Sequence, residues 1–531
     1  MHLRDLKIKG ILVIPDSILI DKFSNEIKEK NLTVFSIPFS TLIREIDPKL
    51  MILKNTIVIG AIIRLLNLSR IEYEEIIVKN FNDRKKVIDV NKKALISGIE
   101  YLESHYLELI PKINFQKGIF PNTNLIINGN EAIALGAIAS DLKFLAQYPI
   151  TPATSILKFI SQHAKKLGIV VKQIEDEIAA IISITAASWA GARSMTATSG
   201  PGFSLMAEGI GYAGMTETPV VIILSQRVGP STGIPTKMEQ ADLMSVLYAS
   251  HGEFPRYIIA PRNVEECFDA TVKAFNIADR YQLPVILMTD FALSENIVST
   301  QPFDMNVDID RGYIWSGPTE LDPEFKKFKL TENGISPRAF PGTEGGIHVL
   351  VGAEHDEKSH SLSGNRCGLP SSGVLHEKMI EKRFKKLELL VEDMDAPRWY
   401  GEENADFTII CWGSTESACK DTIDRLNADK HNFNDFSWNV LSFKDIYPLP
   451  TKKIIPELHK IKKGIMFEVN YTGQFKKLLY INTGWKPLDS ITVLTGETPT
   501  AFEIIQEITK KLSEWQKNEQ KKYALVEEVW Y

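Results

Sequence analysis

The feature that most restricts the fold is a series of short apolar segments between Asn124 and Leu293. Each is rich in β-branched residues and lacks the polar–apolar alternation of a half-exposed strand. Helix-like segments separate them, and this alternation is typical of a parallel sheet with helices on both faces. The sequence therefore predicts a doubly wound α/β domain with the strands LIIN, FLAQYPI, IVVKQI, SMTATS, PVVIILS, YIIA and PVILMTD.

The 531-residue chain is too long for one core, so further segments are expected on both sides of this domain. Residues 1–115 read as a small α/β unit. Residues 301–405 are rich in Gly, Pro, Ser and charge and read as a loop-rich connection with one basic helix near Glu377–Leu390. The strand–helix alternation resumes over residues 406–531. We therefore expect a multidomain α/β protein whose doubly wound domain covers residues 124–300.

Composition limits the classes of function. The net charge is −6 with acids and bases interspersed, so no nucleic-acid partner is expected. The first ten residues are charged where a signal peptide needs an apolar core, and the apolar stretch Thr56–Leu66 contains Arg64 and is too short to span a bilayer. We therefore expect a cytoplasmic protein with no membrane partner.

The cysteines do not form a metal-binding pattern. They are scattered and include no C-x-x-C pair, so we expect neither structural zinc nor an iron–sulfur cluster in this chain. Cys411 lies in the apolar run FTIICWG and is expected to be a buried thiol. The four positions are Cys267, Cys367, Cys411 and Cys419.

The helix that follows the turn YPITPAT has marked ends. Thr151 can cap it, Pro152 suits its first helical position, and Gly168 suits its end. Thr151 can also offer its hydroxyl or backbone N–H to a carboxylate at a helix start, so an ordinary cap and a binding role both remain open. The expected apolar face of this helix comprises Ala153, Ile156, Leu157, Ile160, Ala164 and Leu167.

A run of acids begins the next helix. Glu175, Asp176 and Glu177 stand where a helix amino terminus stabilises negative charge, which is one sufficient reason for them. Glu177, however, opens the segment IAAIISITAASWAGA, which is apolar on nearly every side. A carboxylate there is costly unless it is protonated or hydrogen-bonded, so a functional role is the second interpretation.

Two loops beyond predicted strand ends complete the candidate site, because ligands of doubly wound sheets bind there. Ser199 and Gly200 begin a tight SGPG turn that lets a ligand approach the backbone, and the small residues behind it favour close packing on another helix or subunit. Arg227 leaves a buried strand for a loop that contains Thr236. A guanidinium near hydroxyls suits a planar carboxylate, and a structural ion pair is the alternative.

Longer stretches of the sequence resemble a known family. The chain is similar over residues 124–531 to the alpha subunit of 2-oxoacid:ferredoxin oxidoreductases, most closely those of the 2-oxoglutarate type. The stretches that carry the resemblance are YPITPAT, EDEIAA, ATSGPGFSLMAEGIGYAGMTETPVVI, QRVGPSTGIPTKMEQAD, HGEFPR, TENGISPRAFPGTEGG, GAEHDE and EVNYTGQF.

The resemblance implies a shared cofactor site. In this family the alpha chain supplies the pyrimidine-binding domain for thiamine diphosphate, followed by a transketolase C-terminal-like α/β domain. The beta subunit holds the diphosphate, Mg²⁺ and a 4Fe–4S cluster. Ferredoxin accepts the electrons, and coenzyme A accepts the acyl group. The absence of a GDG motif with its following Asn from this sequence agrees with that division. An (αβ)₂ assembly is expected.

The resemblance also implies residue roles. Glu177 matches the glutamate that bonds the aminopyrimidine ring as a protonated carboxyl, and Ser199 and Gly200 lie beside the cofactor. Thr151, Arg227 and Thr236 match positions that bind the 2-oxoacid or line its pocket.

The first 115 residues resemble part of the gamma module of the same enzymes, without its opening glycine loop, so a coenzyme A contact there is in doubt. Three alternatives remain. The chain could be a non-catalytic assembly subunit, a self-contained thiamine enzyme such as a transketolase, or an enzyme for pyruvate or another 2-oxoacid.

Overall fold

The computed structural model describes residue 3 and residues 6–18, 20–82, 84–113, 124–320, 323–362, 370–428 and 436–527. The chain divides into two compact units, Met1–Asn122 and Thr123–Tyr531. Cys367 lies outside the described residues.

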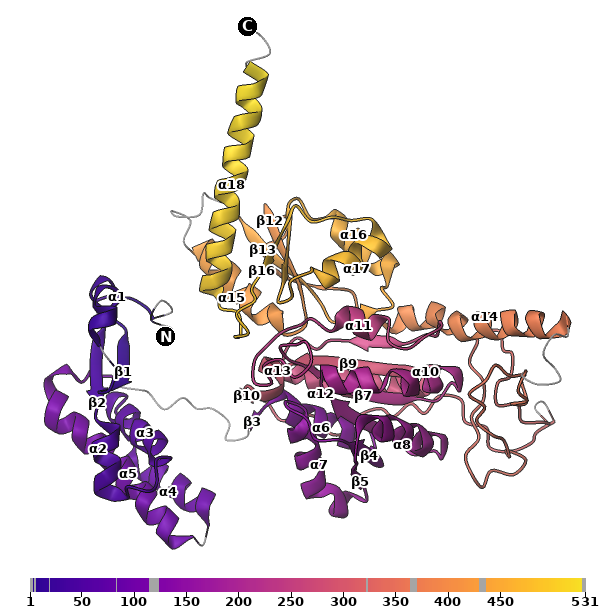
Figure 1. Ribbon diagram of the computed structural model, residues 1–531, viewed down its shortest axis with the longest axis horizontal. Coiled ribbons are helices and arrows are strands. Elements are labelled where there is room, and N and C mark those ends of the chain that lie inside the picture. Colours follow the sequence, from indigo (N-terminus) through magenta and orange to yellow (C-terminus); the bar gives the residue numbers. More distant parts are fainter. Residues whose placement is uncertain are drawn as a thin grey trace. The chain divides into compact units, whose positions relative to one another are not determined.

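The first unit is a small α/β structure (Figure 1). Its strands β1 (Ile11–Pro15) and β2 (Thr33–Ile37) pair in parallel. The helices α3 (Leu53–Leu65) and α5 (Lys85–Tyr106) touch through glycines, since a Cβ at Gly60 would lie 2.1 Å from the Leu95 carbonyl oxygen. The other helices are α1 (Ser24–Glu29), α2 (Phe39–Ile46) and α4 (Arg70–Phe81).

The second unit contains a seven-stranded sheet in the order β14-β8-β9-β7-β6-β4-β5. All neighbours are parallel except β14 and β8, as the unbroken apolar runs predicted. Its strands are β4 (Phe144–Gln147), β5 (Val170–Gln173), β6 (Ser194–Thr198), β7 (Val220–Gln226), β8 (Tyr257–Ile259), β9 (Pro284–Asp290) and β14 (Asp445–Tyr447).

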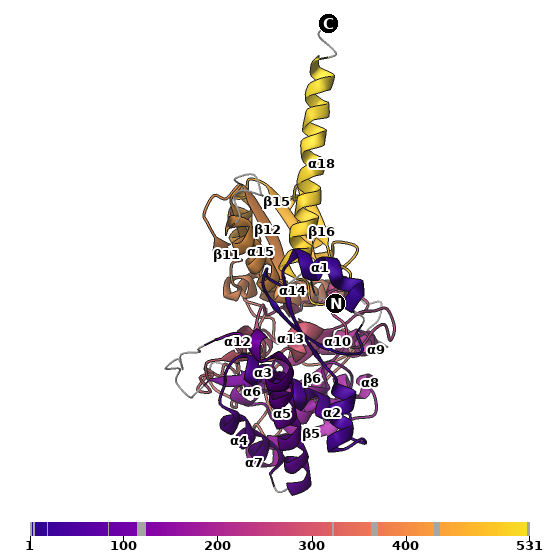
Figure 2. The same ribbon diagram turned by 90° about the vertical axis from the view of Figure 1, so that its left-hand side faces the viewer.

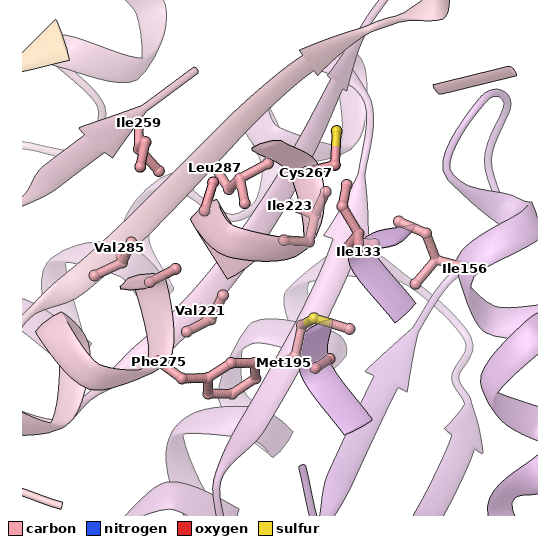
Figure 3. Close-up of a cluster of buried hydrophobic side chains, with 14 of the residues drawn as sticks. Ile133, Ile156, Met195, Val221, Ile223, Ile259, Cys267, Phe275, Val285 and Leu287 are labelled. Carbon is pink, nitrogen blue, oxygen red and sulfur yellow. The ribbon is translucent and has the colours of Figure 1, made fainter. Parts of the chain in front are cut away.

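Helices cover both faces of this sheet. On one face α6 (Gly129–Ala139), α7 (Thr154–Leu167) and α12 (Val264–Tyr281) enclose the core drawn in Figure 3, where Phe275, Val285 and Leu287 are labelled. The other face carries α8 (Glu177–Trp189), α9 (Gly200–Leu205), α10 (Ala207–Met215) and α11 (Leu243–Leu247). α13 (Phe291–Glu295) follows β9.

Two details of the predicted domain are wrong. The segment LIIN does not join the parallel sheet, because β3 (Leu125–Ile127) pairs antiparallel with β10 (Val298–Thr300) in a separate ribbon. Three apolar residues cannot specify a partner strand, and the ribbon brings together the two ends of this part of the chain. Leu167 is also 41% exposed rather than part of the buried face of α7.

The start of α7 also differs from the prediction, because Thr151 does not cap it and Pro152 lies before its first residue, Thr154. Ala153 precedes the first helical residue and makes no side-chain capping bond. The turn is held from outside instead: the Asn130 side chain donates to the Pro152 carbonyl at 2.9 Å, and the Gln147 amide donates to the Ala153 carbonyl at 2.9 Å. Gly168 ends the helix in the left-handed conformation, as predicted.

A second sheet has the order β11-β13-β12-β15-β16. Its strands are β11 (Arg398–Gly401), β12 (Phe407–Trp412), β13 (Trp438–Phe443), β15 (Gly464–Glu468) and β16 (Asp489–Thr492). The helices around it are α15 (Glu416–Ala428), α16 (Thr451–His459), α17 (Gln474–Thr483) and α18 (Ala501–Glu527). Figure 2 shows α18 continuing beyond the sheet.

The two sheets share one core. Ile222 and Ile258 of the seven-stranded sheet pack in the same cluster as Trp412 and Phe443 of the second sheet. Cys411 is buried, as predicted, and is a free thiol. None of the helices in the described residues is long and apolar enough to cross a membrane.

The connection between the sheets is irregular, as expected from its composition. The described residues from 301 to 362 form only isolated bridges, and α14 (Pro370–Asp393) follows. Buried charges anchor the connection. Arg311 and Arg338 join Arg193 on the carboxylate of Asp279 in α12.

Candidate functional site

The candidate site lies where the strand order of the large sheet reverses. From β4 the chain passes to β5 on one side and then to β6 on the other. In open α/β sheets, such a reversal leaves a crevice at the carboxyl ends of the two strands. The turns that follow β4 and β6 contain Thr151 and Ser199, respectively.

Glu177 and Asp176 divide the roles that the sequence left open. Asp176 caps α8, since its carboxylate accepts the Ala179 backbone N–H at 2.7 Å. Glu177 therefore is not needed as the cap. It is the first residue of the helix and only 4% exposed, and no described residue donates a hydrogen bond to its carboxyl group. The carboxyl is thus buried without a partner from the described part of this chain.

Gly202 makes the position of Glu177 possible. A Cβ atom there would lie 2.3 Å from Glu177 Oε1 and 2.1 Å from Thr198 Oγ1. Atoms do not approach this closely, so a side chain at residue 202 would displace the carboxyl group. The first turn of α9 therefore needs glycine for its contact with Glu177.

The same turn contains a second unpartnered polar atom. Ser199 is fully buried, and its Oγ has no hydrogen-bond partner among the described residues. Gly200 beside it faces Asp242, whose Oδ2 would lie 2.8 Å from an added Cβ. Ser199, Gly200 and Glu177 are thus gathered around one turn.

Asp242 is a residue that the sequence reasoning missed. Burial, helped by the nearby charge of Glu239, raises the pKa of its carboxyl to about 6, while the attraction of Arg227 opposes this shift. Its backbone N–H donates to the Gln226 side chain at 3.2 Å. The only signal in the sequence is its place in the stretch KMEQAD after the Arg227 loop.

Arg227 is the first residue after β7 and is 8% exposed. Its Nη1 donates to the Thr151 backbone carbonyl at 2.7 Å, which joins the loop after β7 to the turn after β4. Its Nε has no acceptor and its guanidinium makes no ion pair within the described residues. Burial lowers its pKa, and Asp242 opposes this. Arg227 therefore does not form the structural ion pair with a carboxylate that was its alternative role.

The two threonines of the predicted site differ in their connection to it. Thr151 is exposed and meets Arg227 through its backbone carbonyl rather than its hydroxyl. Thr236 is exposed two residues after the Val228–Ile234 bridge, and no hydrogen bond among the described residues joins it to Thr151 or Arg227. The structure thus groups Glu177, Ser199 and Gly200, links Thr151 to Arg227, and leaves Thr236 apart.

Comparison with known proteins identifies the family of this chain. Residues 135–364 match the thiamine diphosphate-binding family of pyruvate flavodoxin/ferredoxin oxidoreductases, and residues 1–101 match the pyruvate ferredoxin/flavodoxin oxidoreductase family. The 2-oxoacid:ferredoxin oxidoreductase subunit alpha of Saccharolobus solfataricus is 36% identical over 502 residues, which cover 88% of this chain and 74% of that protein. The chain belongs to the family of 2-oxoacid:ferredoxin oxidoreductase alpha subunits.

Other members extend the comparison. The 2-oxoglutarate synthase subunit KorA of Methanothermobacter thermautotrophicus is 33% identical over 387 residues, covering 72% of this chain and 98% of that protein. A solved 2-oxoglutarate:ferredoxin oxidoreductase from Magnetococcus marinus, with 2-oxoglutarate, coenzyme A and succinyl-CoA bound, superposes with a TM-score of 0.80. It is 32% identical, and the match covers 90% of this chain and 80% of that one. The predicted α/β fold with a thiamine diphosphate-binding domain is confirmed.

Proposed function

We propose that this alpha subunit, paired with a beta subunit, oxidatively decarboxylates 2-oxoglutarate to an acyl-CoA and CO₂ and passes the electrons to ferredoxin. The observation that carries the proposal is the carboxyl of Glu177, buried without a partner from the described residues beside the turn that follows β6. The names of the KorA relatives and of the Magnetococcus enzyme favour 2-oxoglutarate over pyruvate or another 2-oxoacid.

The residues around the SGPG turn fit the pyrimidine end of thiamine diphosphate. A buried carboxyl is costly without a hydrogen-bond partner, and the ring nitrogens of an aminopyrimidine can supply one to Glu177. Ser199 Oγ is a second buried group in need of a partner, and Gly200 leaves the backbone open to close approach. The cofactor supplies the electron sink for breaking the bond between the carboxylate and the 2-oxo carbon.

Arg227 is the proposed receptor for the substrate carboxylate, and Thr151 and Thr236 are proposed to line the same pocket. Arg227 is already oriented by its bond to the Thr151 carbonyl, and its Nε has no acceptor within the described residues. A preoriented guanidinium binds a planar carboxylate through paired hydrogen bonds. Asp242 offsets part of the positive charge of Arg227 and so weakens the binding of the substrate carboxylate.

The helix that begins at Glu177 argues that a second chain covers the site. Ile178 is 51% exposed and Ile182 is 40% exposed, one turn apart on the outer side of α8. Adjacent exposed isoleucines on one helix suit a surface that another protein covers. We propose that the beta subunit covers it and also holds Mg²⁺ and the 4Fe–4S cluster, within a cytoplasmic (αβ)₂ enzyme.

The four segments expected from the sequence keep their proposed roles. Residues 124–300 form the pyrimidine-binding domain, and residues 301–405 connect it to the transketolase C-terminal-like domain of residues 406–531. Residues 1–115 are proposed to be a partial gamma-like module.

The test is anaerobic, 2-oxoacid-dependent reduction of a viologen dye, with thiamine diphosphate, Mg²⁺ and coenzyme A. The chain is assayed alone and after co-expression with its beta subunit, and the candidate 2-oxoacids are compared. Activity is expected only in the pair, to be greatest with 2-oxoglutarate, and to be lost in Glu177→Gln. Glu175→Gln is the matched control, because Glu175 is an exposed acid two residues away.

Each outcome is informative. Activity of the lone chain would exclude the shared site, and higher activity with pyruvate would reassign the substrate. A well-folded pair with no activity on any 2-oxoacid would favour the non-catalytic assembly subunit.

A further inference from the structure

A second group of buried charges lies at the opposite end of α8 from Glu177. Its centre is Glu217, which follows α10 and is only 1% exposed. Around it are three lysines that we call the lysine cluster: Lys327 from the irregular connection, and Lys382 and Lys386 from α14. Neither the fold nor the proposed reaction accounts for three buried ammonium groups on one carboxylate.

Both carboxylate oxygens of Glu217 are engaged by two of these lysines. Lys382 Nζ donates to its two oxygens at 2.6 and 2.8 Å, and Lys386 forms a second ion pair with it. Both cations hold the pKa of the Glu217 carboxyl far below its usual range despite complete burial. This carboxylate therefore has little capacity left for a third cation.

Lys327 is the third cation, and it lacks a partner. It is 4% exposed, and its ammonium makes no hydrogen bond or ion pair with any described residue. Glu217 attracts the ammonium without a hydrogen bond to it, and the ring of Phe328 lies 5.3 Å from Nζ to the centroid. Burial lowers the pKa of Lys327 to about 7, so near neutral pH it must either lose its proton or gain an anion.

The neighbouring groups offer no spare negative charge. Asp279 is shared by three guanidinium groups at 2.8–2.9 Å, one of them that of Arg338. Arg338 is 4% exposed, and its Nε and Nη1 have no acceptor among the described residues. Glu354 is paired with Arg383, and Glu357 lies 3.3 Å from Lys326. The positive charge thus exceeds the negative charge around Lys327.

A small cavity adjoins this excess charge. Its volume is ≈ 10 Å³, and Lys327, Arg338, Glu217, Trp189 and His348 are among the residues that line it. A cavity of this size holds a single water-sized species. His348 does not supply an anion, because its Nε2 accepts from Trp189 Nε1 at 2.9 Å and its Nδ1 bonds the Gly346 carbonyl.

We propose that this cavity binds one small monovalent anion of the size of chloride, with Lys327 as its principal ligand and Arg338 as a second source of positive charge. A water molecule fits the volume but brings no negative charge, whereas an anion both accepts hydrogen bonds from the ammonium and offsets the excess. The bound anion fastens residues 327–348 of the connection to the carboxyl end of α8.

The first experiment compares thermal unfolding of the full chain in sodium chloride and in sodium gluconate at equal ionic strength and pH 7. Gluconate is too large for the cavity, so general screening is matched and only the specific effect remains. The melting temperature is expected to be higher in 200 mM chloride by about 2 °C. Lys327→Met should lose this difference. Lys453→Met should keep it, because Lys453 bonds only backbone carbonyls elsewhere.

Equal melting temperatures in the two salts would overturn the proposal, as would a chloride effect that persists in Lys327→Met. The second experiment needs no variant and decides the case if Lys327→Met does not fold. Crystals of the wild-type chain grown in sodium bromide should show an anomalous peak in the cavity beside Lys327. A water-like density without anomalous signal would refute the anion site.

Discussion

Gly202→Ala tests whether the placement of Glu177 depends on the turn beneath it. The added Cβ would lie 2.3 Å from Glu177 Oε1 and 2.1 Å from Thr198 Oγ1, whereas an ordinary contact starts near 3.4 Å. The carboxyl must therefore withdraw by about 1 Å or α9 must shift by as much. A misplacement of about 1 Å costs about 100-fold in rate, and overpacking of this kind costs about 1–3 kcal/mol of folding free energy.

The assay is viologen reduction by the alpha–beta pair, together with the melting temperature of each variant. We expect kcat/KM of Gly202→Ala to fall about 100-fold while the chain remains folded. Gly373→Ala is the matched control, because a Cβ there meets nothing within 4 Å.

A variant background distinguishes the proposed cause from a general distortion. In a Glu177→Ala, Thr198→Ala background both side-chain atoms that the added Cβ would meet are gone, so adding Gly202→Ala should lower the residual activity by much less than 100-fold. If the folded Gly202→Ala variant retains wild-type kcat/KM, or if its effect is the same in the wild-type chain and in this background, the reasoning is wrong.

Three further predictions concern charged groups. Glu217→Gln leaves the lysine cluster without its carboxylate and should lower the free energy of unfolding by about 3–5 kcal/mol, measured by urea titration. Because the pKa of Glu217 is depressed in the fold, its contribution should be complete above the ordinary carboxyl range and decline as the pH falls below it. Asp242, with a pKa raised to about 6, gains charge as the pH rises through that value, so KM for the 2-oxoacid should increase there by about 5-fold, and Asp242→Asn should flatten this dependence. The pKa of Lys327 is lowered from 10.5 to about 7. The loss of folding stability caused by burying its charge is therefore greatest below pH 7 and vanishes as the pH approaches 10.5. In chloride-free buffer, Lys327→Met should therefore be more stable than the wild type by about 2 kcal/mol at pH 6, and equal in stability at high pH.

The sequence predicted those parts of the fold that depend on neighbouring residues. The unbroken apolar runs that became β7 and β9 are completely buried in the middle of the sheet, where such runs belong. The prediction for the first strand was wrong because the pairing of β3 depends on β10, more than 170 residues later. The cap of α7 failed for the same kind of reason, since Asn130 holds the turn from another helix.

The sequence predicted the site residues that directly follow a strand, because it also predicted where the strands end. Ser199 and Arg227 each follow a strand directly, so the parallel sheet alone brings their loops to one edge. Asp242 was missed because it directly precedes α11, a five-residue helix that the sequence analysis did not predict. Its contact with the turn at Gly200 exists only in the folded chain.

The lysine cluster shows where reasoning from local pattern must fail. Lys382 and Lys386 belong to a helix whose composition predicts a basic, solvated surface, yet both are at least 96% buried. What buries them is Glu217, 165 residues before Lys382, together with the irregular connection that covers it. Lysine is rarely buried unless it is paired, so a sequence that does not reveal the pair predicts exposure. A buried charge is therefore visible only once the fold is known, and so is the excess of charge that an anion can balance.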